Sequence, residues 1–423
     1  MKFASKLAVT AAALMTGMSG LMISGEAGAV PAFARQTGMA CNTCHFQSFP
    51  ALTAFGRSFK AGGFTMMGAA PLIEAEGLSL PSTLNVSVIT KIRNSWTKDD
   101  GATGYTSEMA WPDEAALLIG GRLNADTGYL MELGLGKGSN FLSTKVHFNL
   151  AQMGGTQISV IPFSTDGLGV AYGFELLNTG AFRADRPIED RKAFSANQLL
   201  TAGGSPLDGD AGEALGFAAV ASASNFFVNA SVYTPIFEGD VISKQAIYLR
   251  GAYMTDVAGW DVGAGAQIYT GGFDTGSHGA ANAETNVFDF QAQGAVGGMP
   301  LGLYGSVGSS PKGTAADHNA YNGSLVTDAS ALGVLAKLSP TAKTAVYGAF
   351  SKLDDEDYNM VAGSPVANGA DRSVTRVTVG ATYKPSQNIS WDAYSTTTTT
   401  TSTLANRADT SDILLMLQFF AGY

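Results

Sequence analysis

Positive charge is scarce in this sequence, and charge of either sign is low. Of 423 residues only 14% are charged, with 25 Lys and Arg against 35 Asp and Glu, whereas an ordinary soluble chain carries about 25%. A nucleic-acid-binding protein neutralises phosphates with clustered basic residues, so the composition argues against that class. Aromatic residues are plentiful, with 23 Phe and 14 Tyr, which argues against a disordered chain.

Cysteine and long apolar runs are scarce as well. Two cysteines are too few for a disulfide-stapled scaffold. Beyond residue 29 no run of about 18 apolar residues occurs, so no transmembrane helix is expected. Residues 1–29 combine a basic start, an apolar core and an Ala27-Gly28-Ala29 cleavage pattern, which predict a secretory signal peptide. A membrane anchor is the alternative, but the apolar core is short and interrupted.

From about residue 82 onward the sequence follows a strand pattern. Segments with every second position apolar, such as 329–338 and 374–383, alternate with turns rich in Gly, Asn, Asp, Ser and Thr. This pattern fits either a large soluble β-protein or a transmembrane β-barrel, whose strands face lipid on one side and water on the other.

Three features favour the membrane barrel. The secretory signal delivers the chain to the periplasm. Residues 413–423 form an apolar strand that ends in an aromatic residue, which resembles the C-terminal signal recognised by the bacterial barrel-assembly machinery. From residue 178 onward, tight turns alternate with long polar connections, as in outer-membrane barrels. The predicted long connections are 178–212, 271–284, 309–328, 352–371 and 397–409.

The strand candidates between residues 82 and 420 come out odd in number, whereas a single-chain bacterial barrel needs an even number. Because the alternation of turns holds from residue 178 to the C-terminus, one candidate between 82 and 178 is false. We therefore predict a mainly β protein, with a transmembrane antiparallel barrel of about 16 strands over residues 81–423. A small α-helical haem segment over residues 30–80 precedes it.

The motif that carries chemistry lies before the predicted strands. Cys41, Cys44 and His45 form a C-x-x-C-H sequence, the attachment site of a c-type haem. Two thiols one helical turn apart can bond the two haem vinyl groups, and the adjacent imidazole can bind the iron as proximal ligand. A structural disulfide between the cysteines would give the adjacent histidine no role. A thioredoxin-like redox pair is expected next to a βαβ unit, and the sequence around the motif does not show the pattern of such a unit. We predict one covalently bound c-type haem.

The residues around this motif carry a family resemblance. Positions 31–36, the C-x-x-C-H motif, positions 49–52 and positions 55–64 resemble the fused monohaem cytochrome–porin outer-membrane proteins of iron-oxidising bacteria. The specific match spans residues 31–66, and the rest of the chain matches in architecture and length only. The resemblance implies a cytochrome lodged in or under the barrel, extracellular ferrous iron as electron donor and periplasmic c-type cytochromes as acceptors.

The second axial ligand of the haem iron is left open. Met66 and Met67 follow the predicted helix of the haem segment, and methionine ligation would raise the redox potential. His147 is the alternative, because polar positions alternate with apolar ones over 141–150 and place it inside the lumen. Met39 is a further candidate. The ordinary interpretations, packing methionines and a lumen-lining histidine, also stand.

An acidic run forms a second candidate site. Asp354, Asp355, Glu356 and Asp357 fall in the predicted connection 352–371. Carboxylates suit hard cations, and a local negative field concentrates Fe²⁺. A solvated surface loop explains the same run without any binding role.

Two function classes follow from these observations. The first, which the resemblance implies, is an outer-membrane electron conduit: an oxidoreductase that oxidises extracellular Fe²⁺ through one haem and passes the electron to a periplasmic c-type cytochrome. The same conduit can serve another extracellular donor or acceptor. The second class is a passive outer-membrane porin that the haem segment plugs. In both classes the barrel contacts outer-membrane lipid, and no nucleic-acid partner is expected.

Overall fold

The computed structural model describes residues 31–68, 70–135, 142–166, 169–180, 194–201, 213–235, 242–275, 279–314, 317–322, 324–361, 364–403 and 409–422. The predicted signal peptide, residues 1–29, lies outside the described residues. Within the described ranges, no helix is long and apolar enough to cross a bilayer.

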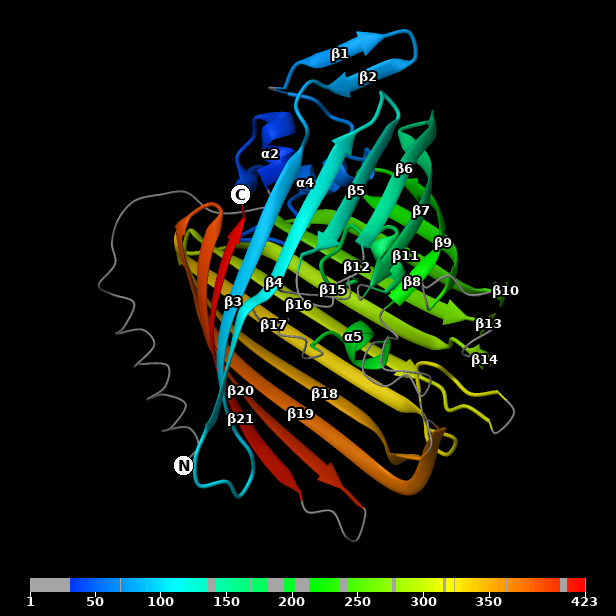
Figure 1. Cartoon of the computed structure of the whole chain (residues 1–423), viewed down its shortest axis with the longest axis vertical. Coiled ribbons are helices and arrows are strands. Elements are labelled where there is room, and N and C mark those ends of the chain that lie inside the picture. The colour runs from blue at the N-terminus through cyan, green and yellow to red at the C-terminus, as the bar shows by residue number, and fades with distance from the viewer. Residues whose placement is uncertain are drawn as a thin grey trace.

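Sixteen antiparallel strands close into one barrel (Figure 1), which confirms the predicted barrel and its strand number. The last strand, β21 (Thr410–Gly422), pairs with the first, β3 (Val86–Lys98), and so closes the ring. Closure leaves no unpaired strand edge, as a sheet in a bilayer requires. The strands between them are β4 (Thr106–Arg122), β5 (Thr127–Gly134), β6 (Leu142–Met153), β7 (Thr156–Asp166), β8 (Glu213–Ser222), β9 (Phe226–Thr234), β11 (Ala246–Val257), β12 (Trp260–Thr270), β15 (Thr285–Val296), β16 (Met299–Ser310), β17 (Ala329–Thr341), β18 (Thr344–Val361), β19 (Ser364–Ser386) and β20 (Ile389–Ser402).

The two ends of the barrel differ in their connections. Tight turns such as Gly154-Gly155 and Gly297-Gly298, whose residues all have positive φ, join strands at one end, here named the turn end. The opposite end, named the loop end, carries the longer connections. Two small sheets lie outside the barrel: β1 (Leu72–Ala75) with β2 (Leu78–Pro81) beyond the turn end (Figure 1), and β10 (Ile242–Lys244), β13 (Gly272–Thr275) and β14 (Gly279–Asn282) at the loop end.

Residues alternate between the two faces of each barrel strand, and β9 shows what each face holds. Val228 and Val232 are 50% and 44% exposed, whereas Asn229 and Ser231 between them are buried. Apolar side chains therefore point outward and polar ones inward, the reverse of a soluble protein. This distribution matches a barrel with lipid outside and a polar lumen.

The surplus strand candidate is the segment 167–177. Its described part contains one 3₁₀ turn, η1 (Val170–Tyr172), and packs inside the barrel. Phe174 and Leu177 are almost fully buried there. Their apolar pattern belongs to a segment that fills the lumen, which explains why it was mistaken for a strand of the wall.

A buried charge cluster ties this inner segment to the wall. Arg250 of β11 donates hydrogen bonds to Glu175 of the segment at 2.9 Å and to Asp289 of β15 at 2.6 Å. The amides of Leu176 and Leu177 also donate to Glu175. Buried charges are tolerated when they are paired and hydrogen-bonded in this way. Near it, α5 (Ala196–Thr201) lies inside the barrel as well (Figure 1).

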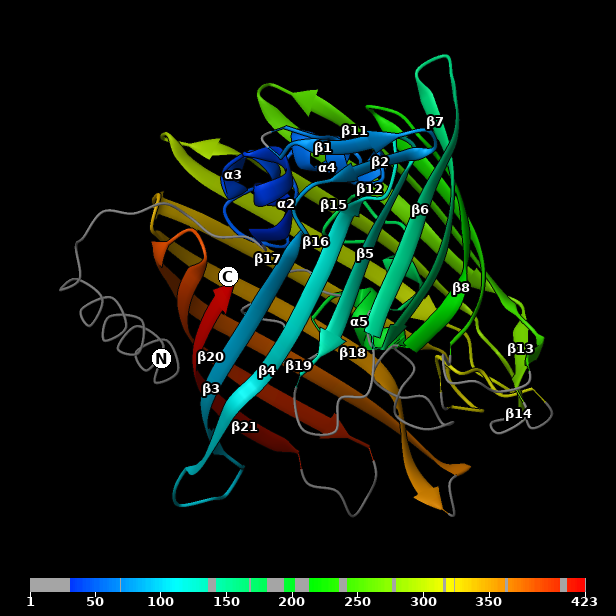
Figure 2. The same cartoon turned by 45° about the horizontal axis from the view of Figure 1, so that its top comes forward.

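The residues before the barrel form three short helices in its turn-end mouth. These are α2 (Pro31–Thr37), α3 (Cys41–Cys44) and α4 (Ala54–Ala61), and Figure 2 shows them within the ring of strand ends. Residues 31–68 are named the mouth segment. The predicted helical part of residues 30–80 ends at residue 61, and the β1–β2 hairpin that follows was not predicted.

Candidate haem site

Helix α4 is the framework of the mouth segment. Thr53 caps its first turn, because the Thr53 hydroxyl oxygen accepts a hydrogen bond from the Gly56 amide at 3.1 Å. After the helix, Gly63 adopts a φ of 67°, a backbone conformation that glycine takes without strain. The cap and the glycine therefore set where the helix begins and where the chain turns away from it.

Three phenylalanines hold the helices of the mouth segment together. The Phe33 ring of α2 lies 5.2 Å from the Phe59 ring of α4 and 4.9 Å from the Phe64 ring, measured between ring centroids. Phe59 and Phe64 are buried. So small a segment cannot bury a large core by itself. This aromatic cluster is its hydrophobic core.

The two thiols and the imidazole of the C-x-x-C-H motif lie on one turn. Cys41 and Cys44 begin and end α3, and the His45 amide donates a hydrogen bond to the Cys41 carbonyl at 2.9 Å. Neither cysteine is in a disulfide. A Cβ atom at Gly56 of α4 would lie 2.0 Å from the Cys44 carbonyl oxygen. Glycine at position 56 is therefore what lets α4 pack directly against the motif.

One ring nitrogen of His45 is engaged by the backbone. His45 Nδ1 lies 3.3 Å from the Ala51 carbonyl oxygen, and an isolated antiparallel bridge pairs His45 with Leu52. Metal-binding histidines commonly donate one ring N–H to a carbonyl, which leaves the other nitrogen for the metal. Although the His45 side chain is only half-buried, loss of hydration lowers the pKa of His45 to about 4. The imidazole is therefore neutral at pH 7, the form that binds iron.

This donor set fits a c-type haem. The thiols of Cys41 and Cys44 are the groups that bond the vinyl carbons, and the free nitrogen of His45 is the group that binds iron. The cavity beside Phe49, at the ends of β19, β20 and β21, has a volume of about 40 Å³. That is room for water and not for a porphyrin. The fit therefore rests on the donor groups, and this cavity adds nothing to it.

The barrel wall holds the motif through hydrogen bonds. The Cys41 amide donates to Gln387 Oε1, in the turn between β19 and β20, at 3.0 Å. Gln47 Nε2 donates to the Lys337 carbonyl oxygen of β17 at 2.8 Å. In return, Lys337 Nζ donates to Ser48 Oγ at 2.9 Å. The motif is thus fixed to strands far from it in the sequence.

Two further strands of the wall hold α4 and the residues that follow it. Arg57 forms an ion pair with Asp261 of β12, with a closest N–O distance of 2.7 Å, and the Arg57 side chain is buried. Asn149 Nδ2 of β6 donates to the Gly62 carbonyl oxygen at 3.0 Å. Around the ring of strands, β6 lies opposite β17 and β12 lies between them, near β17, so the mouth segment is held from three positions of the wall.

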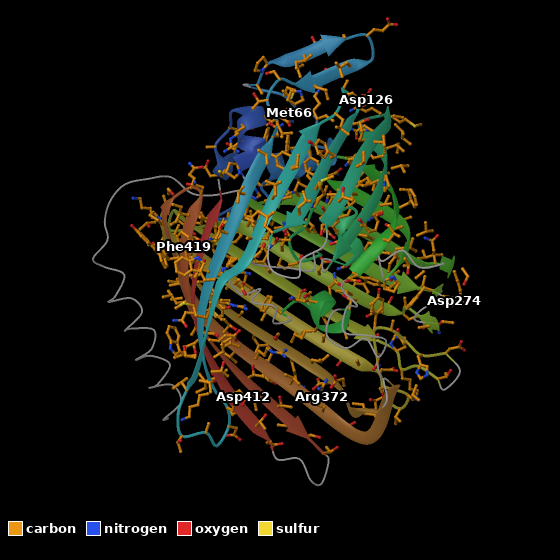
Figure 3. All side chains as sticks on the ribbon, viewed as in Figure 1. Met66, Asp126, Asp274, Arg372, Asp412 and Phe419 are labelled. Carbon is orange, nitrogen blue, oxygen red and sulfur yellow. The ribbon has the colours of Figure 1, made fainter. Side chains whose placement is uncertain are left out.

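The candidate distal ligands occupy different places. Met66 lies at the turn-end rim, where its side chain is 39% exposed (Figure 3), and Met67 follows it. His147 points into the lumen from β6 and is 2% exposed, in line with its alternating pattern. Its Nε2 atom has no hydrogen-bond partner among the described residues.

His147 and the motif lie toward opposite ends of α4. Gly56 packs against Cys44, whereas a Cβ atom at Gly63 would lie 3.0 Å from the His147 ring. Gly56 lies in the first turn of α4, whereas Gly63 lies two residues beyond its last residue, Ala61. No hydrogen bond, ion pair or ring contact among the described residues joins His45 to Met66, Met67 or His147. The distal ligand stays a prediction.

The acidic run 354–357 does not lie in a loop, and that prediction is wrong. β18 continues to Val361 and pairs with β19, which begins at Ser364, so the predicted connection 352–371 is a long hairpin. Asp354, Asp355 and Glu356 place polar residues on both faces of the strand, so no alternation of apolar and polar residues marks it there.

Three of the four acidic side chains have partners. Asp354 accepts a hydrogen bond from Lys352 Nζ at 2.7 Å, and Asp355 accepts one from Arg372 Nε at 2.8 Å. Glu356 is 1% exposed and accepts a hydrogen bond from the Ser324 hydroxyl. The side chain of Asp357 lies outside the described residues. Pairing with two cations weakens the field that attraction of Fe²⁺ would need.

Sequence reasoning missed the wall residues that hold the motif. Asp261, Lys337 and Gln387 are distant from it in the sequence, and each is a polar residue on a strand or at a turn of the barrel. Lys337 is 2% exposed, and a charged side chain inside a barrel needs a partner. The strand pattern could have shown that Lys337 points inward, but not which residue it meets.

Comparisons with known proteins give similarity of architecture alone. No protein-family model matches the chain. No curated protein matches it either. Similar solved structures include the outer-membrane channel DcaP of Acinetobacter baumannii, with 10% sequence identity and a TM-score of 0.49 over 80% of this chain and 96% of that chain. OmpT of Vibrio cholerae has 12% sequence identity and a TM-score of 0.48 over 84% of this chain and 100% of that chain. An anion-selective porin from Comamonas acidovorans has 11% sequence identity and a TM-score of 0.47 over 81% of this chain and 99% of that chain.

Proposed function

We propose that this chain is an outer-membrane electron-transfer protein with one c-type haem bound at Cys41, Cys44 and His45. Its closed barrel with apolar residues outside supports the membrane placement. Tight turns face the periplasm in barrels of this kind, so the turn end with the mouth segment is periplasmic and the loop end is extracellular.

The observation that carries this proposal is that two segments of the chain, the mouth segment and the η1 segment, occupy the lumen. At the turn end, the mouth segment is bonded to the wall by Arg57 with Asp261 and by Lys337 with Ser48. Deeper in the lumen, the η1 segment is bonded to the wall through Arg250. A solute needs an open path through these segments, whereas an electron does not.

The residues of the motif have separate tasks in this proposal. Cys41 and Cys44 would anchor the haem to α3, and His45, oriented by the Ala51 carbonyl, would bind its iron. A bound haem supplies a centre that accepts and donates one electron at a time. Because the mouth segment lies at the turn end, a periplasmic c-type cytochrome is the acceptor we propose. Extracellular Fe²⁺ as donor rests on the family resemblance alone.

The second candidate is a haem-plugged porin. The barrel architecture by itself favours this alternative, since sixteen-strand barrels of this kind commonly conduct solutes. The two candidates differ in what crosses the membrane: ions and small solutes for the porin, electrons for the conduit.

Reconstitution separates the two. In planar bilayers the conduit should show no steady ion conductance, whereas the porin should give stepwise channels. In proteoliposomes loaded with oxidised cytochrome c, the conduit should reduce the enclosed cytochrome when Fe²⁺ is added outside. A Cys41→Ser/Cys44→Ser variant should lose that reduction while the vesicles stay sealed. Channels together with no haem-dependent reduction would establish the porin.

A further inference from the structure

The β1–β2 hairpin presents one apolar face that the barrel does not cover. In its register Ile73 lies opposite Leu80, and Ala75 lies opposite Leu78, and residues directly opposite each other in an antiparallel pair share a face. All four side chains of this face are apolar. Ile73 is 51% exposed and Leu78 is 39% exposed, so the face is open to solvent.

The other face of the hairpin is attached to the barrel rim. Arg122, at the end of β4, donates hydrogen bonds to the Ser79 hydroxyl at 2.8 Å and to the Thr65 carbonyl oxygen at 3.3 Å. Ser79 lies opposite Glu74 in the register. These bonds attach the hairpin to the rim through Ser79, on the face opposite Ile73 and Leu78, and the hairpin lies beyond the turn end (Figure 1).

The hairpin is also joined to the haem-binding segment. The amides of Gly68 and Ala70 donate to the Gln36 carbonyl oxygen of α2 at 3.2 and 3.4 Å. Gln36 itself donates to the Met66 carbonyl oxygen at 2.7 Å. Helix α2 leads directly into the C-x-x-C-H turn, so the hairpin face and the motif belong to one connected body at the turn end.

The surroundings of this face are acidic. Residues 64–85 contain Glu74 and Glu76 and no Lys, Arg or His, and both side chains are exposed. Asp126, on the neighbouring turn at the same end, is exposed as well (Figure 3). Two cations lie nearby and both are engaged: Arg122 is held by its bonds to Ser79 and Thr65, and Arg35 of α2 donates to the Val86 carbonyl oxygen at 2.6 Å.

We propose that the apolar face of the β1–β2 hairpin, with Glu74 and Glu76 beside it, docks a soluble electron carrier whose own contact face is apolar and ringed by lysines. The charge match attracts such a carrier and speeds its encounter. A small apolar face with a charged rim suits a transient redox complex, because these complexes bury little area, whereas a stable dimer needs a larger apolar surface. This inference names the acceptor surface for the proposed electron transfer and rests on that function.

The test compares hairpin variants with a matched control. Glu74→Gln/Glu76→Gln removes two charges at the turn end, and Asp99→Asn/Glu108→Gln removes two exposed charges near the loop end. In stopped flow, reduced protein in detergent donates to lysine-rich mitochondrial cytochrome c. At low ionic strength we expect the hairpin variant to react about 3- to 10-fold more slowly than wild type and the control to match wild type. The difference should shrink as salt rises.

A binding arm separates this inference from the proposed function. Binding of oxidised cytochrome c to haem-free Cys41→Ser/Cys44→Ser protein, with and without the hairpin changes, needs no electron transfer. Weaker binding of the hairpin variant supports the docking face even if the chain is not an electron carrier. Equal binding and equal rates for hairpin variant and control would overturn it. So would light scattering that shows a dimer abolished by Ile73→Ser/Leu78→Ser, because the face would then belong to a second copy.

Discussion

Gly128 of β5 lies where the barrel wall meets the mouth segment. A Cβ atom at this position would lie 1.8 Å from the Gly63 carbonyl oxygen. That oxygen belongs to the backbone, so no flexible side chain can move aside to relieve the contact. Gly128→Ala should therefore push the mouth segment away from its docked position while the strand itself stays intact.

The size of the effect follows from the cost of overpacking. Forcing a methyl group into a well-packed site costs about 1–3 kcal/mol. Each 1.4 kcal/mol changes an equilibrium tenfold, so the undocked population should rise roughly 5- to 150-fold. Gly251 of β11 is the matched control, because a Cβ atom there meets only Val228 Cγ1 at 4.0 Å. Gly251→Ala should leave docking unchanged.

Limited proteolysis measures this population. Trypsin cuts after Arg57 and Lys60 of α4, and Arg57 is buried while the segment is docked. When opening is fast relative to cleavage, the cleavage rate follows the open population. We expect faster cleavage in Gly128→Ala, with the folded barrel still visible by its heat-dependent gel migration. Cleavage at the wild-type rate would refute the docked position of the mouth segment.

Three further predictions concern the haem and the acidic run. Cys41→Ser/Cys44→Ser should abolish haem staining of the denatured protein on a gel, and full staining would contradict covalent attachment at the motif. Ferric spectra of Met66→Ala, Met67→Ala and His147→Ala should show high-spin iron only in the variant that removes the distal ligand, and low-spin spectra in all three would reject all three candidates. Asp354→Asn/Asp355→Asn should change the rate of Fe²⁺ oxidation less than about twofold at low ionic strength, because paired surface charges contribute little. A large, salt-dependent loss of rate would show that the run attracts Fe²⁺ despite Lys352 and Arg372.

Local patterns in the sequence predicted most of the fold. Alternation of apolar and polar residues identified all sixteen barrel strands, because a wall with lipid outside and polar contacts inside imposes that period. The same rule misled at 167–177, where Phe174 and Leu177 are apolar because they pack inside the lumen. It also failed in β18 at Asp354, Asp355 and Glu356, where successive polar residues fall on both faces of the strand.

The sequence predicted the haem-attachment residues of the candidate site but not the barrel residues that surround them. The spacing of Cys41, Cys44 and His45 follows from haem chemistry and is readable in the sequence. The partners Asp261 and Lys337 come from strands more than two hundred residues away, and no local pattern encodes which strand faces the motif. The β1–β2 hairpin was missed because each of its strands has only four residues, too few to show a period.

The contacts of the mouth segment explain how so small a unit can hold a defined position. Its aromatic core consists of Phe33, Phe59 and Phe64, and fewer than about 40 residues rarely fold alone. Arg57 and Ser48 of the segment are bonded to Asp261 and Lys337, inward residues of the wall. The lumen of a membrane barrel is polar because apolar side chains face the lipid outside. This polar surface can face water or hold an inner segment.

In this chain the wall has the same alternation of apolar and polar residues that an open channel requires. The distinction between a channel and a conduit therefore lies in the residues that occupy the lumen. A search for related proteins should therefore compare inward wall residues with the mouth segment as pairs, since the ion pair of Arg57 with Asp261 and the hydrogen bond of Lys337 with Ser48 each need both residues.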